Sequence, residues 1–151
     1  MVIRTNNREL TPADLVASEK RMGHPIPARY RALLLEHNGG GIEPSGFEFQ
    51  DPVGARSSCV HRILGIHGGH SNLEDYLRSY RDRIPSDLFP IAHDPGGNLV
   101  LIGTGAENGG RIFFWDHDFE ADDGETPDYR NVYPVAESLD AFLAALSDEE
   151  R

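Results

Sequence analysis

The sequence predicts an α+β fold with an antiparallel β-sheet, and the order of its patterned segments is the main reason. Helical patterns come first, four short apolar runs cluster after residue 87, and one helical pattern closes the chain. Turn-forming residues separate the runs. Segregated helices and strands with short connections indicate an α+β fold rather than alternating β-α-β units. A length of 151 residues is typical of one domain, so we expect a single domain over residues 1–151.

Residues 11–22 carry the signals of a first helix. Thr11 is a favoured N-cap residue, and Pro12 suits the first helical position. Asp14 lies three residues after the cap, where a carboxylate favours the positive end of the helix dipole. Gly23 follows the pattern and is expected to end the helix.

A second helix is expected within residues 24–41, where Pro27 opens the helical pattern. Three residues fall on one face at helical spacing, and His37 falls less directly on it. They are Tyr30, Leu33 and Leu34. Asn38 and Gly39 supply a left-handed end to this helix.

Two more helices are expected at residues 72–84, capped by Ser71 or Asn72, and at residues 137–146, capped by Ser138. Strand candidates are residues 46–51, 57–66, 88–94, 98–103, 111–117 and 131–135. Helical or strand spacing places six large residues in the core, and they are Tyr30, Leu33, Leu34, Trp115, Phe142 and Leu146.

Residues 93–118 combine glycine-rich turns with acids, histidines and the one tryptophan. The stretch 103–108 resembles the phosphate-binding pattern G-x-G-x-x-G, but Asn108 replaces the third glycine. A phosphate-binding loop must also open a helix, whereas a strand pattern follows here. We therefore interpret Pro95-Gly96-Gly97 and Asn108-Gly109-Gly110 as turns between antiparallel strands.

Calcium binding of the EF-hand type is also excluded, because two required positions of the motif hold the wrong residues. Asp116, Asp118 and Glu120 have the alternate spacing of an EF-hand loop, but the sixth position is Ala121 and the twelfth is Pro127. An EF-hand requires glycine and glutamate there. A looser cation site stays open beside the favoured interpretation, a solvated acidic loop.

No metal, cofactor or catalytic activity is expected. His67 and His70, His93 with Asp94, and the acids around His117 have no recognised ligand spacing. Cys59 has no second cysteine for a metal pair or an internal disulfide, and we interpret it as a small core residue. The chain has no Gly-x-Ser-x-Gly elbow.

Charge is the most informative property of the composition. The chain has 25 acidic and 14 basic residues, a formal net charge of −11, which disfavours nucleic acid and anionic lipid and suits a cationic partner. Residues 116–128 form an expected loop with seven carboxylates and no lysine or arginine. We take these as candidate partner-binding residues: Asp116, Asp118, Glu120, Asp122, Asp123, Glu125 and Asp128. The alternative is that the acids only maintain solubility.

The location expected from the sequence is the cytoplasm, without a membrane partner. No run of about 18 apolar residues is present, and the first residues lack the apolar core of a signal peptide. The one cysteine, Cys59, fits a reducing compartment.

Four segments together resemble the SUKH superfamily, in the order that the family has them. IPARYRALLLEHNGG (26–40) is similar to the family's helix ending in Asn-Gly-Gly, and LFPIAHDPGGNLVLIG (88–103) to its central hairpin. GRIFFWDHD (110–118) is similar to the following strand, and ESLDAFLAAL (137–146) to the closing helix. One departure is the uniformly apolar run NLVLIG, where many relatives have a more polar strand.

The resemblance implies a curved, mostly antiparallel β-sheet flanked by N-terminal helices and a C-terminal helix. It also implies a protein without catalytic activity. Bacterial members of the superfamily are immunity proteins that bind and neutralise a cognate toxin domain, often a nuclease, and fungal members regulate cell-wall synthesis. We therefore expect either a basic toxin domain as partner or a regulatory or scaffolding role without a toxin.

Overall fold

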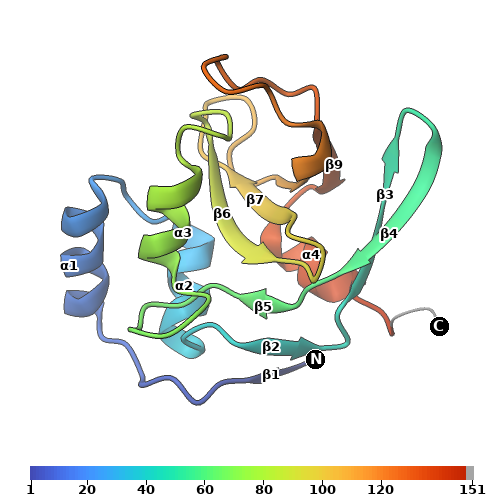
Figure 1. The fold of residues 1–151 in the computed structure, drawn as a ribbon. Coiled ribbons are helices and arrows are strands. Elements are labelled where there is room, and N and C mark those ends of the chain that lie inside the picture. The colour runs from blue at the N-terminus through green and yellow to red at the C-terminus, as the bar shows by residue number, and fades with distance from the viewer. Residues whose placement is uncertain (149–151) are drawn as a thin grey trace.

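The computed structural model describes residues 1–148, and these form the expected α+β fold (Figure 1). The helices are α1 (Pro12–Met22), α2 (Ala28–Glu36), α3 (Leu73–Tyr80) and α4 (Leu139–Ala145). The strands are β1 (Val2–Arg4), β2 (Gly41–Glu43), β3 (Gly46–Asp51), β4 (Gly54–Cys59), β5 (Arg62–Ile63), β6 (Leu88–His93), β7 (Leu99–Gly103), β8 (Ile112–Trp115) and β9 (Val132–Ala136). A short 3-10 helix, η1, spans His117–Phe119. Residues 149–151 of the expected single domain lie outside the described part.

The strands pair as the sequence predicts, in antiparallel fashion. The main sheet has five strands in the order β5-β6-β7-β8-β9, and each neighbouring pair is antiparallel. Two smaller ribbons, β1–β2 and β3–β4, flank it. A bridge between Gly40 and Ile63 joins the first ribbon to β5. The β3–β4 hairpin projects from the body of the molecule (Figure 1).

The local helix signals correspond to real caps. The Thr11 side chain accepts a hydrogen bond from the Asp14 backbone, the Asp14 carboxylate accepts one from the Thr11 backbone, and Gly23 ends α1 with φ of 69°. Asn72, rather than Ser71, caps α3, and Ser138 caps α4. These ends could be predicted because the capping hydrogen bonds join residues only three apart.

The end of α2 differs from the expectation. The helix stops at Glu36, and the following residue, His37, is extended. The Asn38 side chain instead joins distant segments: its amide donates to the carbonyls of Arg8 and Ile66, and its oxygen accepts from the Ile66 backbone. Asn38 therefore serves tertiary contacts, and the left-handed Gly39 only redirects the chain after them.

The expected strand over residues 57–66 is wrong, because the chain changes its partner within it. Through Cys59 it pairs with β3, and the Val60 amide donates to the Ser45 carbonyl. The His61 amide then donates to the His93 carbonyl, which starts the pairing with β6. The segment is therefore two short strands in different sheets.

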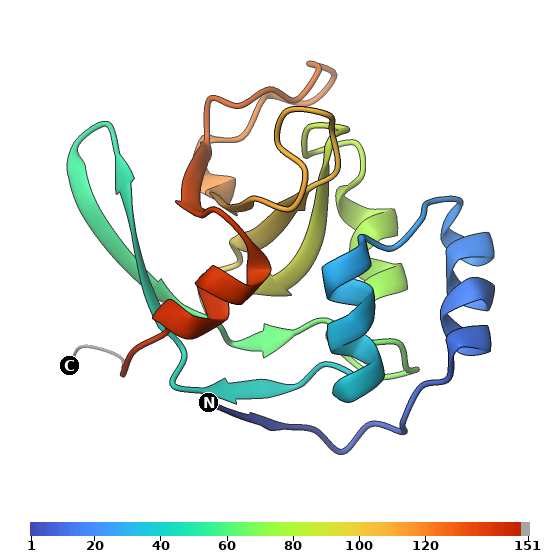
Figure 2. The same ribbon diagram turned by 180° about the vertical axis from the view of Figure 1, so that it is seen from behind.

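The uniformly apolar run in β7 is explained by burial on both faces of the strand. Val100 and Ile102 belong to the larger core with residues of α2 and α4, which lie on the same side of the sheet in Figure 2. Leu99 and Leu101 belong to a second core with Trp115. An antiparallel sheet often leaves one face to water, but here a second layer covers it. The six residues expected in the core are all buried, from 0% exposed for Trp115 to 8% for Leu146.

Replacement of Trp115 by alanine should lower the free energy of unfolding by about 3–5 kcal/mol, because a buried indole leaves a large cavity. The Trp115 ring is fully buried and meets the Tyr80 ring edge-on at 5.7 Å. Urea unfolding followed by circular dichroism measures the change. Val53→Ala is the control, since Val53 is 96% exposed and should shift stability by less than about 0.5 kcal/mol. Equal stabilities for the two variants would contradict the assignment of the second core.

Candidate partner-binding surface

The acidic segment 116–128 leaves the sheet where β8 ends and returns where β9 begins. Its base is closed by two hydrogen bonds: the Asp116 amide donates to the Asn131 carbonyl, and the Asn131 side chain donates to the Asp116 carbonyl. Gly124 has φ of 85°, in the left-handed region that suits a turn. The segment is thus a loop anchored at both ends, with η1 as its one helical turn.

Asp116 is not part of the exposed loop, and this corrects the expectation that all seven carboxylates lie in a polar, unburied loop. The residue is 2% exposed. One carboxylate oxygen accepts from the Asp118 backbone and starts η1, and the other lies 2.9 Å from the Arg56 guanidinium. Asp116 therefore presents no free carboxylate to a partner, and its role is structural.

Arg56 comes from β4 and connects the projecting hairpin to the base of the acidic loop. Its guanidinium lies 5.3 Å from the ring centre of Phe49 and 5.6 Å from that of Phe114. The hydrogen bond to Asp116 raises the pKa of Arg56, and a second carboxylate, Asp51, lies 3.5 Å away. Aromatic faces and carboxylates both attract a guanidinium, so this contact fixes the hairpin against the sheet.

Three further acids of the loop are paired with arginines. Glu120 accepts two hydrogen bonds from Arg83, at 2.8 and 3.0 Å. Asp128 accepts from Arg130, which lowers the pKa of Asp128, and Glu125 lies 3.8 Å from the same guanidinium. The sequence stretch itself has no lysine or arginine, yet the fold brings arginines to it from both flanks.

Asp118, Asp122 and Asp123 are the loop carboxylates that form no ion pair with an arginine or lysine in the described part of the chain. All three residues are exposed. Asp118 has only the His117 ring beside it, at 3.6 Å. These three side chains therefore carry the negative charge that is most available to a partner.

The fold adds residues to this surface that the sequence did not single out. Asp82 and Asp87 lie in the connection from α3 to β6 and line a hollow of about 820 Å³ together with Glu125 and Asp128. Tyr129 lines it too, and its hydroxyl donates to the Asp87 carboxylate. Burial and this contact raise the pKa of Tyr129 to about 12, so it stays protonated.

Two aromatic side chains are exposed among these acids. Phe119 is 62% exposed and Tyr129 is 43% exposed. Aromatic residues are frequent energetic centres of protein interfaces. We define the acidic surface as these two aromatics and the exposed or half-buried acids around them: Asp82, Asp87, Asp118, Phe119, Glu120, Asp122, Asp123, Glu125, Asp128 and Tyr129. Only tertiary structure brings residues 82 and 87 to the loop, so no pattern in the sequence could have found them.

The other polar residues singled out in the sequence organise turns. Asp94 accepts hydrogen bonds from the Gly96 and Asn98 backbones, which closes the turn between β6 and β7. The His117 ring contacts the Gly96 carbonyl at 2.8 Å, and His67 accepts from the Gly69 backbone. No group of three histidine, cysteine or carboxylate side chains within residues 1–148 is arranged to hold a metal ion.

His93 is held differently, half-buried between α3 and the sheet. The Tyr76 ring stacks on it at 5.2 Å, and the Ser71 hydroxyl lies 2.9 Å from its Nε2. Burial lowers the pKa of His93, and the neighbouring His61 and Arg62 act in the same direction.

Within residues 1–148, none of the helices has the length and apolar character that a membrane span requires.

Comparison with known proteins agrees with the resemblance seen in the motifs. Residues 9–145 match the model of the SMI1 / KNR4 family (SUKH-1). The chain belongs to this family. It is also 25% identical, over 154 aligned positions, to YokK, an uncharacterized protein derived from the SPbeta prophage of Bacillus subtilis (strain 168). That alignment covers 92% of this chain and 76% of the relative.

Asp116→Ala should lower the free energy of unfolding by about 1–3 kcal/mol, because it leaves Arg56 without its buried partner and removes the cap of η1. Asp118→Ala is the matched control and should cost less than about 0.5 kcal/mol, since its carboxylate is exposed. Chemical denaturation of both variants measures the difference. A larger loss for Asp118→Ala would contradict the structural role given to Asp116.

Stability should also fall as the pH drops from about 7 to about 5.5, and His93 should account for part of the fall. The unfolded chain takes up a proton on this histidine near its ordinary pKa of 6.5, whereas in the folded protein the pKa is lower. Protonation in this window therefore favours unfolding. His93→Gln should flatten the dependence, and His70→Gln, at an exposed position, should not. Unfolding free energies measured across this pH range would contradict the prediction if both variants keep the wild-type slope.

Proposed function

We propose that this chain is a non-catalytic immunity protein that binds and neutralises a cognate polymorphic toxin domain in the cytoplasm. The observation that carries the proposal is the acidic surface, where three exposed aspartates form no ion pair with an arginine or lysine of residues 1–148 and two aromatic rings are exposed. Membership of the SMI1 / KNR4 family supports it, because toxin neutralisation is one of the two roles that the wider resemblance implies. The prophage origin of a relative is consistent with this role.

The electrostatic reason for the proposal is complementarity with an enzyme that binds phosphates. A nuclease uses a basic site to hold its substrate, and a protein of net charge −11 is attracted to such a site over a long range. Attraction of this kind raises the association rate and disfavours acidic partners. The aromatic rings of Phe119 and Tyr129 would then supply apolar contact area at the centre of the interface.

Co-expression in bacteria tests the proposal. A toxin domain encoded beside this gene should stop growth when it is expressed alone and should be harmless when this protein is present. The two proteins should also elute as one complex in size-exclusion chromatography. Growth arrest that this protein does not relieve, with no complex formed, would favour a regulatory or scaffolding role instead.

The triple variant Asp118→Asn, Asp122→Asn and Asp123→Asn should associate with the toxin domain about three- to tenfold more slowly at low salt, because it lacks three charges that face the partner. Glu120 is left unchanged, since it holds Arg83 in place. The salt dependence of the association rate should flatten, while stability stays close to wild type. Surface plasmon resonance at several salt concentrations measures both effects.

A matched control removes the same charge elsewhere. Glu9→Gln, Glu36→Gln and Glu48→Gln replace three exposed acids that make no ion pair in the described part of the chain. This control should slow association less than the loop variant does. Equal effects of the two variants would show that net charge alone matters and that the acidic surface is not the interface.

A further inference from the structure

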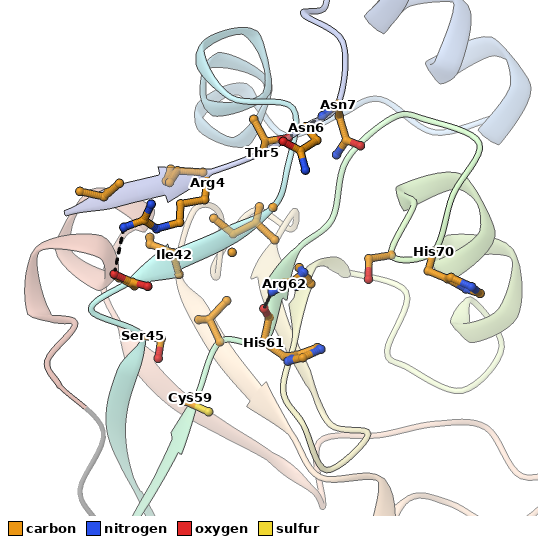
Figure 3. Close-up of a pocket in the computed structure, with 18 of the residues that line it drawn as sticks. Arg4, Thr5, Asn6, Asn7, Ile42, Ser45, Cys59, His61, Arg62 and His70 are labelled. Carbon is orange, nitrogen blue, oxygen red and sulfur yellow. Dashed lines mark hydrogen bonds and ion pairs between the residues drawn. The ribbon is translucent and has the colours of Figure 1, made fainter.

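A groove whose lining is basic, in contrast to the acidic surface, lies between the β1–β2 ribbon and the segment that leads from β4 to α3. It has a volume of about 1040 Å³. Arg4 and Asn6 line it from the N-terminal segment, and His61 and Arg62 from the other wall (Figure 3). The groove shares no residue with the hollow of the acidic surface.

The groove lining has more basic than acidic side chains, whereas the chain as a whole has more acidic than basic ones. Its two arginines, Arg4 and Arg62, face a single carboxylate, that of Glu43. Three histidines add further hydrogen-bonding groups to the lining, and they are His61, His67 and His70. In a protein with 25 acidic and 14 basic residues, such a gathering of arginine and histidine is a local exception.

The strand register places the two arginines on one face. Arg4 is paired directly with Gly41, and residues opposite each other in antiparallel strands project to the same face. Gly41 has no side chain, and the Arg62 guanidinium occupies the space: a Cβ at this glycine would lie 3.1 Å from Arg62 Nη1. Ile3 and Ile42 project to the opposite face and pack on the main core.

Arg62 retains most of its hydrogen-bonding capacity. Its Nη1 donates to the His61 carbonyl at 2.9 Å, and no carboxylate of residues 1–148 forms an ion pair with it. Arg4 lies 3.6 Å from Glu43, and both side chains are 69% exposed. A guanidinium has five N–H donors in a planar fork that fits a carboxylate, so Arg62 is preorganised for one.

We propose that this groove is a second interaction surface, which binds an extended segment of a protein partner through its carboxylates, with Arg62 and Arg4 as the recognising groups. Residues of three neighbouring strands, β1, β2 and β5, line the groove, so an extended segment lying across them would meet both arginines. Alternate residues of that segment would point to the same side and reach the arginines. Nucleic acid carries a charge on every phosphate, so the net charge of −11 disfavours it more strongly than a segment with only a few carboxylates.

Fluorescence anisotropy with defined peptides tests the proposal without knowledge of the natural partner. The probe is a labelled hexapeptide of alternating serine and glutamate, and its uncharged counterpart has glutamine in place of glutamate. Salt at about 0.15 M limits the influence of distant charges to about 8 Å. A labelled oligothymidylate of six nucleotides tests the nucleic-acid alternative. Arg4→Gln with Arg62→Gln is compared with Arg29→Gln and Arg78→Gln, two arginines outside the groove whose side chains are 36% and 73% exposed.

The glutamate peptide should bind the wild-type protein about tenfold more tightly than the glutamine peptide, since two exposed ion pairs contribute on this scale. The groove variant should lose about that factor, while the control variant stays within about twofold. Glu43→Gln should strengthen binding, because it releases Arg4. Thermal unfolding checks that the variants remain folded. Absence of glutamate-peptide binding, equal loss in both double variants, or tighter binding of the oligonucleotide would overturn the proposal.

Discussion

Burial of the central strand β7 on both faces decides where the surrounding helices and loops lie. The apolar residues of β7 need one cover from α2 and α4 and another on the opposite face. Tyr80, Ile84 and the segment around them supply that second cover, and Arg83 extends it over the Trp115 ring to reach Glu120. The acidic loop is therefore held at the rim of a core layer, and its position follows from the packing beneath it.

The fold could be predicted from the sequence where the deciding contacts are local. Thr11 and Ser138 form capping hydrogen bonds with residues three positions away, so their helices could be located from the sequence. Strands β1 and β2 could not, because residues 2–4 pair with residues 41–43 and their short runs have no pattern of their own. The change of partner after Cys59 depends on where β6 lies, which local spacing does not encode.

The sequence predicted the acidic composition of the candidate site but not the arrangement of its side chains in space. The sequence located a run of acids, but the burial of Asp116 depends on Arg56, sixty residues earlier in the chain. The pairing of Glu120 with Arg83 and the arrival of Asp87 beside Tyr129 depend on the same tertiary packing. The structure thus separates acids that stabilise the loop from acids that remain available. It also places a groove lined by arginines elsewhere on the molecule, so a partner can contact both an acidic and a basic surface.

Hydrogen–deuterium exchange of the complex with the toxin domain tests whether the acidic surface is where the two proteins meet. Binding should slow exchange in residues 117–129 and in residues 81–87, which together contain the acidic surface. Exchange in α1, on another part of the molecule, should stay unchanged. A stable complex in which neither of the two segments is protected would contradict the claim that the acidic surface is the interface.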